Sequence, residues 1–265
     1  MSTVTPATVS AVPVVASLAW RELIRFFRQR NRVIGALLQP VIFWVLFSAG
    51  LRSSDLGFEF FFPGTLAMIL LFTAIFTTIS IIEDRREGFL QSVLVAPAPR
   101  WAMVVGKILG GSAIALIQAW LFLALGWLTL EMTSPIADVL LAMALMAVIA
   151  VALTGLGFVI AWRMDSTQGF HAVMSIFLFP LWLLSGSLFP ADAQSWLTWI
   201  SRFNPLSYGV EGMRHYFTFE LETTVQTGPA IASLPVCWLV TIGFAAVMSA
   251  LAWKIAGTRT AGDLL

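Results

Sequence analysis

The sequence predicts an all-α polytopic membrane protein. Of the 265 residues, 59% are hydrophobic and only 11% are charged, and the mean hydropathy is +0.90. Soluble globular domains carry about 25% charged residues, so this chain is too apolar to belong among them. Strands of a membrane barrel alternate between apolar and polar residues, and the sequence lacks that alternation.

Six apolar stretches are candidates to cross the bilayer. A hydrocarbon core about 30 Å thick requires roughly 20 residues of helix, and lipid cannot satisfy the free backbone groups of an irregular segment. The predicted spans are residues 33–51, 60–82, 108–130, 136–162, 171–190 and 231–253. Together they predict a single transmembrane domain over residues 1–265.

The distribution of basic residues predicts that both termini are cytoplasmic. With this topology, 12 of the 15 basic residues lie on the inner side, as the positive-inside rule requires. The inner residues are Arg21, Arg25, Arg28, Arg30, Arg32, Arg85, Arg86, Arg100, Lys107, Arg163, Lys254 and Arg259. The remaining three, on the outer side, are Arg52, Arg202 and Arg214.

The pattern of residues 17–32 predicts a helix that lies in the membrane surface. Apolar residues recur at helical spacing, at Trp20, Leu23, Ile24 and Phe27, and arginines form a stripe on another face. We expect these arginines to face anionic headgroups; a simple basic flank of the first span is the alternative. Residues 1–16 lack the basic start of a signal peptide and are expected to form a flexible tail.

A polar stripe in the second span has two interpretations. Thr73, Thr77 and Ser80 share one helix face, and hydroxyls in spans usually bond to their own helix or a neighbouring one. Helix packing is therefore the simpler interpretation, and a substrate-facing stripe is the other. Together with nearby aromatic residues, which also fill bundles, the candidate path residues are Phe43, Trp44, Phe47, Phe72, Thr73, Phe76 and Thr77.

The segment after the fifth span, residues 191–214, predicts short re-entrant helices on the outer side. Prolines interrupt it while Trp196 and Trp199 keep it apolar, which is typical of helices with indoles at headgroup depth. Backbone groups left free by the interruptions would have to be shielded by protein. An ordinary amphipathic outer loop is the alternative.

The sequence lacks the motifs of several catalytic classes. Gly106-Lys107 is followed by Ile108 rather than Ser or Thr, and no phosphate loop, zinc motif or metal-ligand cluster is present. An intramembrane hydrolase using Ser185 or Ser187 with a histidine (His171 or His215) remains an alternative, although an orienting group is missing. Few ionisable residues lie deep in the predicted spans, which disfavours an ion-driven carrier.

The loop of residues 83–107 concentrates charges between the second and third spans. Its start, "EDRREGFLQSVLV", predicts a short helix with one apolar edge, and "APAP" ends it. A helix with an apolar edge outside the membrane favours a partner groove, and its charges would set orientation. A solvated positive-inside loop is the alternative.

This loop resembles the corresponding segment in membrane subunits of ATP-binding-cassette (ABC) exporters of the second permease class. Glu87-Gly88, Leu90, Pro97, Arg100 and Gly106-Lys107 match the pattern in order, whereas Phe89 replaces the usual threonine. A second similarity lies in "SGSLFP" and "NPLSYGVEGMR". Its matching residues are Ser185, Gly186, Phe189, Pro190, Asn204, Pro205, Leu206, Tyr208, Glu211 and Arg214.

The resemblance implies a non-catalytic permease of the bacterial inner membrane that is surrounded by lipid. Two copies, forming a homodimer, would each dock on a separate ATPase subunit that carries ATP and Mg, so this chain itself needs no cofactor and no nucleic acid. The implied coupling residues are Glu83, Asp84, Arg86, Glu87, Gly88, Phe89, Leu90 and Pro97. The implied cargo is amphiphilic, lipid-linked, saccharide or drug-like; an ATP-independent channel or carrier is the alternative function.

Overall fold

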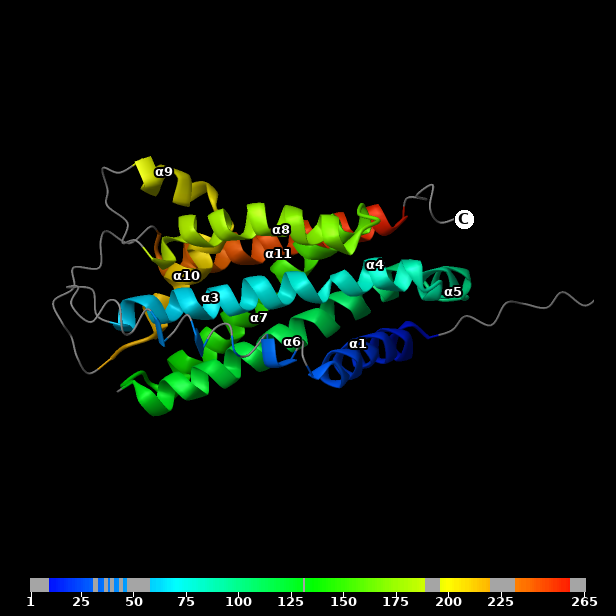
Figure 1. Ribbon diagram of the computed structural model, residues 1–265. Coiled ribbons are helices and arrows are strands. Elements are labelled where there is room, and N and C mark those ends of the chain that lie inside the picture. Colours follow the sequence, from blue (N-terminus) through cyan, green and yellow to red (C-terminus); the bar gives the residue numbers. More distant parts are fainter. Residues whose placement is uncertain are drawn as a thin grey trace, which may run out of the picture.

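The computed structural model describes residues 10–30, 33–35, 38, 41–42, 45–46, 58–130, 132–188, 196–219 and 232–257. In this part of the chain the protein is a bundle of antiparallel helices (Figure 1). Five helices there are long and apolar enough to cross a membrane: Phe60–Arg86, Arg100–Thr129, Ile136–Trp162, Thr167–Ser187 and Leu234–Gly257. The first predicted span, 33–51, falls largely outside the described residues, so a sixth span stays a prediction.

The second predicted span forms the centre of the bundle. It consists of α3 (Phe58–Thr77) and α4 (Ile79–Arg86), which continue one another along the bundle (Figure 1). Helices α6 (Arg100–Thr129), α7 (Ile136–Trp162) and α8 (Thr167–Trp182) pack around it. Its most apolar stretch is 94% buried, against 17% for the last span, so the central helix is covered by protein and the outer helices remain open to lipid.

The last span, α11 (Leu234–Gly257), packs mainly along α7. At its C-terminal end, α8 continues into one turn of π-helix, η1 (Leu183–Ser187), in which Gly186 has a φ of 77°. Two short helices follow, α9 (Trp196–Phe203) and α10 (Pro205–Tyr216). Asn204 caps α10 by accepting a hydrogen bond from the Leu206 backbone N–H at 3.0 Å, and Pro205 occupies the first helical position, where no donor is lost.

Helical structure extends into the predicted loop of residues 83–107. Helix α4 continues to Arg86, α5 covers Phe89–Val95, and α6 begins at Arg100 rather than at residue 108. Gly88, with a φ of 76°, makes the turn between α4 and α5, a conformation that glycine adopts without steric cost. The charged residues stay helical because most of them pair within the protein.

The prediction of a flexible tail over residues 1–16 is wrong for its last part. Helix α1 spans Ala11–Arg28. Pro13 lies in its first turn, where the missing backbone N–H has no partner to lose. Val14 packs against the core, so contact with the rest of the bundle stabilises these residues as helix.

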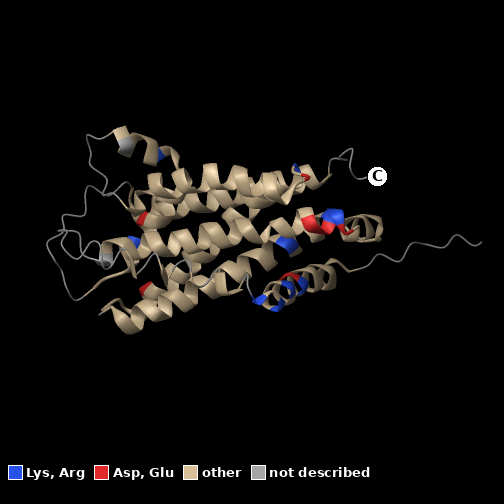
Figure 2. Cartoon of the chain, viewed as in Figure 1, with Lys and Arg blue, Asp and Glu red and all other residues tan. Residues whose placement is uncertain are grey.

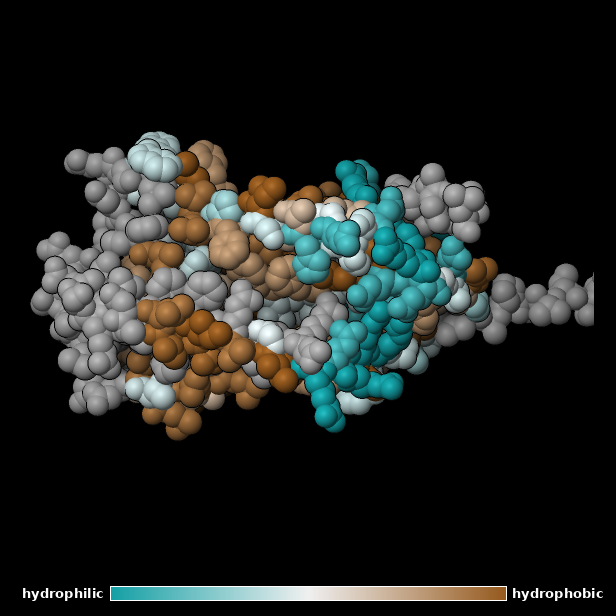
Figure 3. All heavy atoms as spheres, viewed as in Figure 1, coloured by the Kyte–Doolittle hydropathy of each residue, from teal (hydrophilic) through white to brown (hydrophobic). Residues whose placement is uncertain are grey.

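Charged residues gather at one end of the bundle. Lys and Arg on α1 lie beside Asp and Glu on α4 (Figure 2). The same end shows a hydrophilic band on the surface, and apolar side chains cover much of the helices beyond it (Figure 3). We call this the charged end and the opposite one, which holds α9 and α10, the far end.

The far end of the central helix depends on a close approach at Gly64. The Trp182 indole donates a hydrogen bond to the Gly64 carbonyl at 2.8 Å. A Cβ at Gly64 would lie 2.6 Å from the Cβ of Ser187 and 2.8 Å from its backbone oxygen. The Ser187 backbone cannot move aside as a flexible side chain can. Helix α3 and η1 can therefore pack this closely only if residue 64 is glycine.

We therefore expect Gly64→Ala to lower the free energy of unfolding by about 1–3 kcal/mol, the usual cost of overpacking. The matched control is Gly243→Ala in α11, where a Cβ meets nothing within 4 Å and alanine should stabilise the helix slightly. Denaturation of both variants in detergent, followed by tryptophan fluorescence, measures the difference. Equal stabilities would contradict the close approach.

Candidate coupling site at the charged end

Asp84 is the centre of an ion-pair cluster. Its side chain is fully buried and accepts hydrogen bonds from Arg21 at 2.8 and 3.1 Å, from Arg25 at 2.7 Å, and from Lys107. A buried carboxylate is stable only when it is paired and hydrogen-bonded. Because the three bases come from α1 and α6, this single residue ties two helices to α4.

Lys107 completes the buried part of the cluster. Its ammonium donates to Glu22 at 2.5 Å and to the Ser80 hydroxyl at 3.2 Å, and both charged side chains are 5% exposed. Sequence reasoning placed Lys107 on a cytoplasmic flank and missed Glu22. The available signal was the position of Glu22 four residues after Leu18 and four before Phe26, a spacing that puts all three on the buried face of α1.

Two glycines on α6 bring α1 close enough for these contacts. A Cβ at Gly106 would lie 2.9 Å from the Leu18 Cβ, and one at Gly110 would lie 2.8 Å from the Glu22 Cβ. Small residues four apart let helices approach at backbone distance. The two glycines therefore allow α6 and α1 to pack closely.

The rim of the cluster connects α1 to the turn between α4 and α5. Arg25 donates to Glu83 at 2.9 Å and to the more exposed Glu87 at 3.4 Å. The Arg21 guanidinium lies 3.7 Å above the Phe89 ring, a cation–π contact. We name Arg21, Glu22, Arg25, Glu83, Asp84, Glu87 and Lys107 the charge cluster.

A separate contact fixes α4 to the turn between α7 and α8. Arg85 donates to the Trp162 carbonyl at 2.6 Å and to the Met164 carbonyl at 3.3 Å. Its guanidinium also lies 5.4 Å from the Trp162 ring centre. These carbonyls close the end of α7, so Arg85 links the end of the central helix to the next pair of spans.

The predicted coupling residues divide by exposure. Arg86, Glu87 and Pro97 are exposed, and Glu83, Gly88 and Phe89 are half-buried. Asp84 and Leu90 are 0% and 2% exposed. Asp84 is paired within the chain and Leu90 packs in the core, so neither offers an exposed surface to a partner, and their part in coupling stays a prediction.

The expectation that the arginines of α1 face headgroups is also corrected for Arg21 and Arg25, since both turn toward the acids of α4. Arg28, one turn further on, is exposed. The face of α1 that points away from the bundle instead carries Trp20 and Phe27, which are 64% and 49% exposed. The two arginines pair with these acids rather than with headgroups because the carboxylates lie within hydrogen-bond distance.

The candidate path residues lie on two faces of α3. Thr73 donates to Gln118 on α6 at 2.6 Å, and Thr77 donates to the Ala74 carbonyl at 2.7 Å. Phe72 and Phe76 instead meet Phe179 and His171 on α8, with ring centres 5.3 and 5.4 Å apart. These bonds favour helix packing for the two threonines; Phe43, Trp44 and Phe47 lie outside the described residues.

Side chains of the segment between the last two spans donate hydrogen bonds to backbone carbonyls at the far end. Asn204 donates to the Leu181 carbonyl at 2.6 Å, and Ser201 donates to the Leu184 carbonyl at 2.7 Å. Arg214 donates to the Gly186 carbonyl at 2.6 Å. The bonds follow the prediction that protein shields this backbone, while Phe189 and Pro190 of the motif lie outside the described residues.

Two other motif residues stabilise this arrangement. Arg214 lies 4.1 Å from the Phe60 ring centre and 3.7 Å from the Glu211 carboxylate. Burial lowers the pKa of Arg214 to about 10, and the charge of Glu211 opposes that shift, so the guanidinium stays cationic at neutral pH. The Tyr208 hydroxyl donates to the Arg202 carbonyl at 2.9 Å and fixes α10 against α9.

The hydrolase alternative finds no support in the described contacts. Ser185 donates to the Trp182 carbonyl at 2.5 Å and lies 2.6 Å from the Ser187 hydroxyl. His215 lies within 3.4 Å of the Ala232 carbonyl and 3.9 Å of Glu211. A nucleophile needs a base within hydrogen-bond reach, and the described bonds of these serines go to the backbone and to one another.

The charge cluster predicts a large effect for Lys107→Met, which removes the ammonium but keeps a long side chain. Glu22 and Asp84 would then lack their shared partner, and we expect a loss of about 3–5 kcal/mol in the free energy of unfolding. Adding Glu22→Gln should recover part of that loss. The control Lys254→Met changes an exposed lysine and should cost less than about 0.5 kcal/mol; similar losses in denaturant titrations of both single variants would refute the cluster.

Comparison with known proteins assigns the chain to a family. Residues 13–218 match the ABC-2 type transporter family. The transport permease ycf38 of Cyanophora paradoxa is 26% identical over 211 residues, 76% of this chain and 73% of that protein. YbhR of Escherichia coli strain K12, named a multidrug ABC transporter permease, is 29% identical over 182 residues, 68% of this chain but only 46% of that protein. Since the family match covers well over half of the 265 residues of this chain, the apolar helical bundle belongs to the ABC-2 type transporter permeases.

Proposed function

We propose that the chain is the transmembrane subunit of an ABC exporter, driven by ATP hydrolysis on a separate ATPase subunit. The observation that carries this proposal is the elbow formed by α4, Gly88 and α5, which lies at the charged end and is joined to α1 by the charge cluster. The name of the relative YbhR, a multidrug ABC transporter permease, supports the same function.

The outer surface of the elbow offers the features that a docking helix needs. Val95 is 83% exposed although it is apolar, and it ends α5 next to the exposed Pro97. Arg86 and Glu87, where α4 ends, are also exposed. An apolar residue that enters a groove supplies affinity, and the neighbouring charges set orientation, so we assign docking to this outer surface.

The inner surface of the elbow is suited to transmit a displacement. Leu90 is embedded in the core, and Phe89 lies under the guanidinium of Arg21. Asp84 binds α1 and α6 in the buried part of the cluster. Separating buried charges is costly, so a push on α5 should move α4, α1 and the start of α6 together, as in rigid-body switching.

In the proposed topology the charged end faces the cytoplasm and both termini lie there. The exposed stripe of Trp20, Ile24 and Phe27 on α1 then rests in the membrane surface, while Arg21 and Arg25 face the protein. At the far end, Trp196 and Trp199 of α9 are 70% and 62% exposed, which suits indoles at the outer headgroups.

We further propose that two copies of the chain form a homodimer with two ATPase subunits, which carry ATP and Mg, in a bacterial inner membrane. The cargo would be an amphiphilic compound of drug-like, lipid-linked or saccharide type. An ATP-independent channel or carrier is the competing function. Transport by the purified chain without an ATPase would favour that alternative.

Docking through the outer surface predicts that Val95→Asp weakens ATPase binding by at least about tenfold, because a carboxylate loses free energy when it enters an apolar groove. Folding should be unchanged, since Val95 is exposed. Val12→Asp is the matched control, because Val12 on α1 is also exposed, at 74%. Co-purification with the ATPase and permease-stimulated ATP hydrolysis are the measurements; equal activity in both variants would remove α5 from the docking surface.

The topology predicts opposite labelling of α5 and α9. In a Cys237→Ala background, which removes the chain's single cysteine, Ser92→Cys and Arg202→Cys place thiols at exposed positions. A membrane-impermeant maleimide should label Ser92→Cys only in inverted vesicles and Arg202→Cys only in intact cells. The reverse pattern would put the elbow on the outer face and exclude an ATPase partner there.

A further inference from the structure

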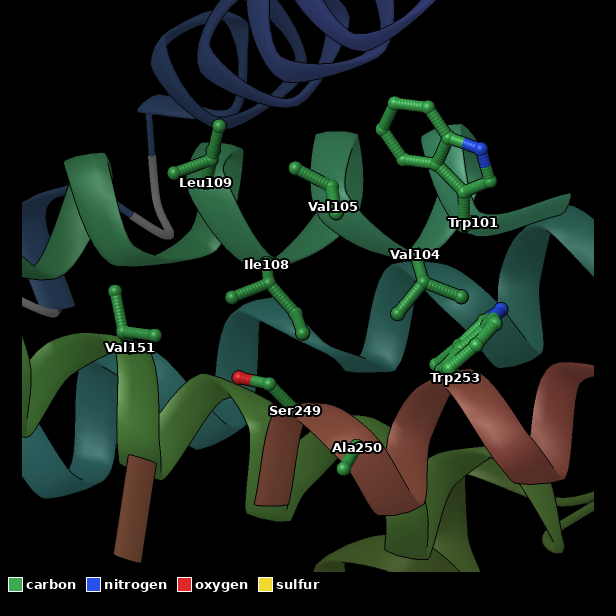
Figure 4. Close-up of a pocket in the computed structure, with 9 residues that line it drawn as sticks. All are labelled: Trp101, Val104, Val105, Ile108, Leu109, Val151, Ser249, Ala250 and Trp253. Atoms are coloured by element: carbon green, nitrogen blue, oxygen red, sulfur yellow. The ribbon is translucent and has the colours of Figure 1, made fainter. Parts of the chain in front are cut away.

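An apolar groove lies between α6 and α11 near the charged end (Figure 4). Its volume is about 470 Å³, within the range of small-ligand sites. The lining residues are Trp101, Val104, Val105, Ile108, Leu109, Val151, Ser249, Ala250 and Trp253. Val104 and Ile108 point from α6 toward α11 (Figure 4), and Ser249 carries the only hydroxyl of the lining.

The helix packing explains why the groove stays open. Helix α11 packs chiefly on α7 and only weakly on α6. Gly155 of α7 admits α11 closely, since a Cβ there would lie 3.1 Å from the Met248 Cβ and 3.4 Å from the Ser249 backbone nitrogen. The side chains that α11 turns toward α6 include the small Ser249 and Ala250, which leave the space between the helices unfilled.

The walls and floor of the groove differ in exposure. Val104 and Ile108 are 2% and 4% exposed and form the floor. Trp101 and Trp253 are 44% and 60% exposed and form the rim. Both tryptophans lie near the ends of spanning helices, where indoles favour the headgroup region, so the groove runs from that depth toward the hydrocarbon core.

Basic residues lie near the ends of α6 and α11, the two helices that form the groove. Arg100, the exposed first residue of α6, donates to the Gly257 carbonyl at 3.1 Å and so lies between the ends of α6 and α11. Lys254, next to Trp253, is exposed. The N-terminus of α6 adds the partial positive charge of its backbone, and Pro99 at the cap position supplies no side-chain hydrogen bond to it.

We propose that this groove binds an anionic phospholipid, with one acyl chain between α6 and α11 and its phosphate beside Arg100 and Lys254. The apolar lining matches a hydrocarbon chain, and the basic rim matches an anionic headgroup. The proposal requires only that the chain spans a bilayer, and it is independent of ATP-driven export.

The test uses two lipid probes with the same diazirine-bearing acyl chain, phosphatidylglycerol and phosphatidylcholine. The full chain is reconstituted in phosphatidylcholine vesicles that contain one probe as a minor component. After illumination, mass spectrometry should place the phosphatidylglycerol adducts on residues 101–109 and 249–253. Arg100→Gln and Lys254→Gln should each reduce the preference for phosphatidylglycerol by about fivefold, the factor that one basic residue contributes at a membrane surface.

Filling the groove provides the second part of the test. Ala250→Leu and Ala250→Trp should lower labelling progressively, and Val247→Trp is the matched control on the same helix, at a 53% exposed position outside the groove. Thermal denaturation verifies that the variants fold, and Ala250→Leu keeps the test valid if the larger side chain prevents folding. Equal labelling by both probes, labelling unchanged in both Ala250 variants, or crosslinks that join two copies of the chain through the groove would overturn the proposal.

Discussion

The carboxylate of Asp84 lies in the interior of the bundle and is stabilised there by Arg21, Arg25 and Lys107. A buried charge without partners costs several kcal/mol, so the fold requires α1, α4 and α6 to stay together at this end. The glycines on α6 that admit α1 serve the same requirement, because a larger side chain would separate the acid from its bases. The position of the N-terminal helix is therefore set by the pairing of charges as well as by apolar contact.

This constraint gives the elbow one buried and one exposed surface. Its inner side, with Leu90 and Phe89, belongs to the bundle, and its outer side, with Val95 and Glu87, is open. A helix that only bound a partner could be loosely attached to the membrane domain. Here the charge cluster connects the turn between α4 and α5 to α1 and α6, which suits the proposed role of passing on a displacement.

At the far end, side chains satisfy free backbone carbonyls instead of a buried carboxylate. The fifth span ends in a wide turn around Gly186, and the carbonyls freed there accept hydrogen bonds from Asn204, Ser201 and Arg214. Lipid offers no donors, so the hydrogen bonds from the segment that contains α9 and α10 satisfy the carbonyls where the fifth span ends. The end of the fifth span therefore depends on hydrogen bonds from the segment between the last two spans.

The sequence by itself determined the class of the protein and the family resemblance. Runs of apolar residues located five spanning helices, since length and hydropathy are local properties, and α7 coincides with the predicted span of residues 136–162. The short helix before "APAP" and the need to shield the backbone near Gly186 were also predictable, because glycine, proline and free carbonyls act locally.

Only the tertiary structure decided where the charges point. From the sequence, Arg21 and Arg25 were expected to face headgroups and Lys107 to lie on the cytoplasmic side. Asp84 was expected to be a coupling residue. Their partners are up to 85 residues away in the chain, and periodicity carries no information on such pairings. The groove between α6 and α11 could not be predicted from the sequence either. It exists because α11 packs on α7, and that packing depends on how the side chains of the helices fit together in the folded protein.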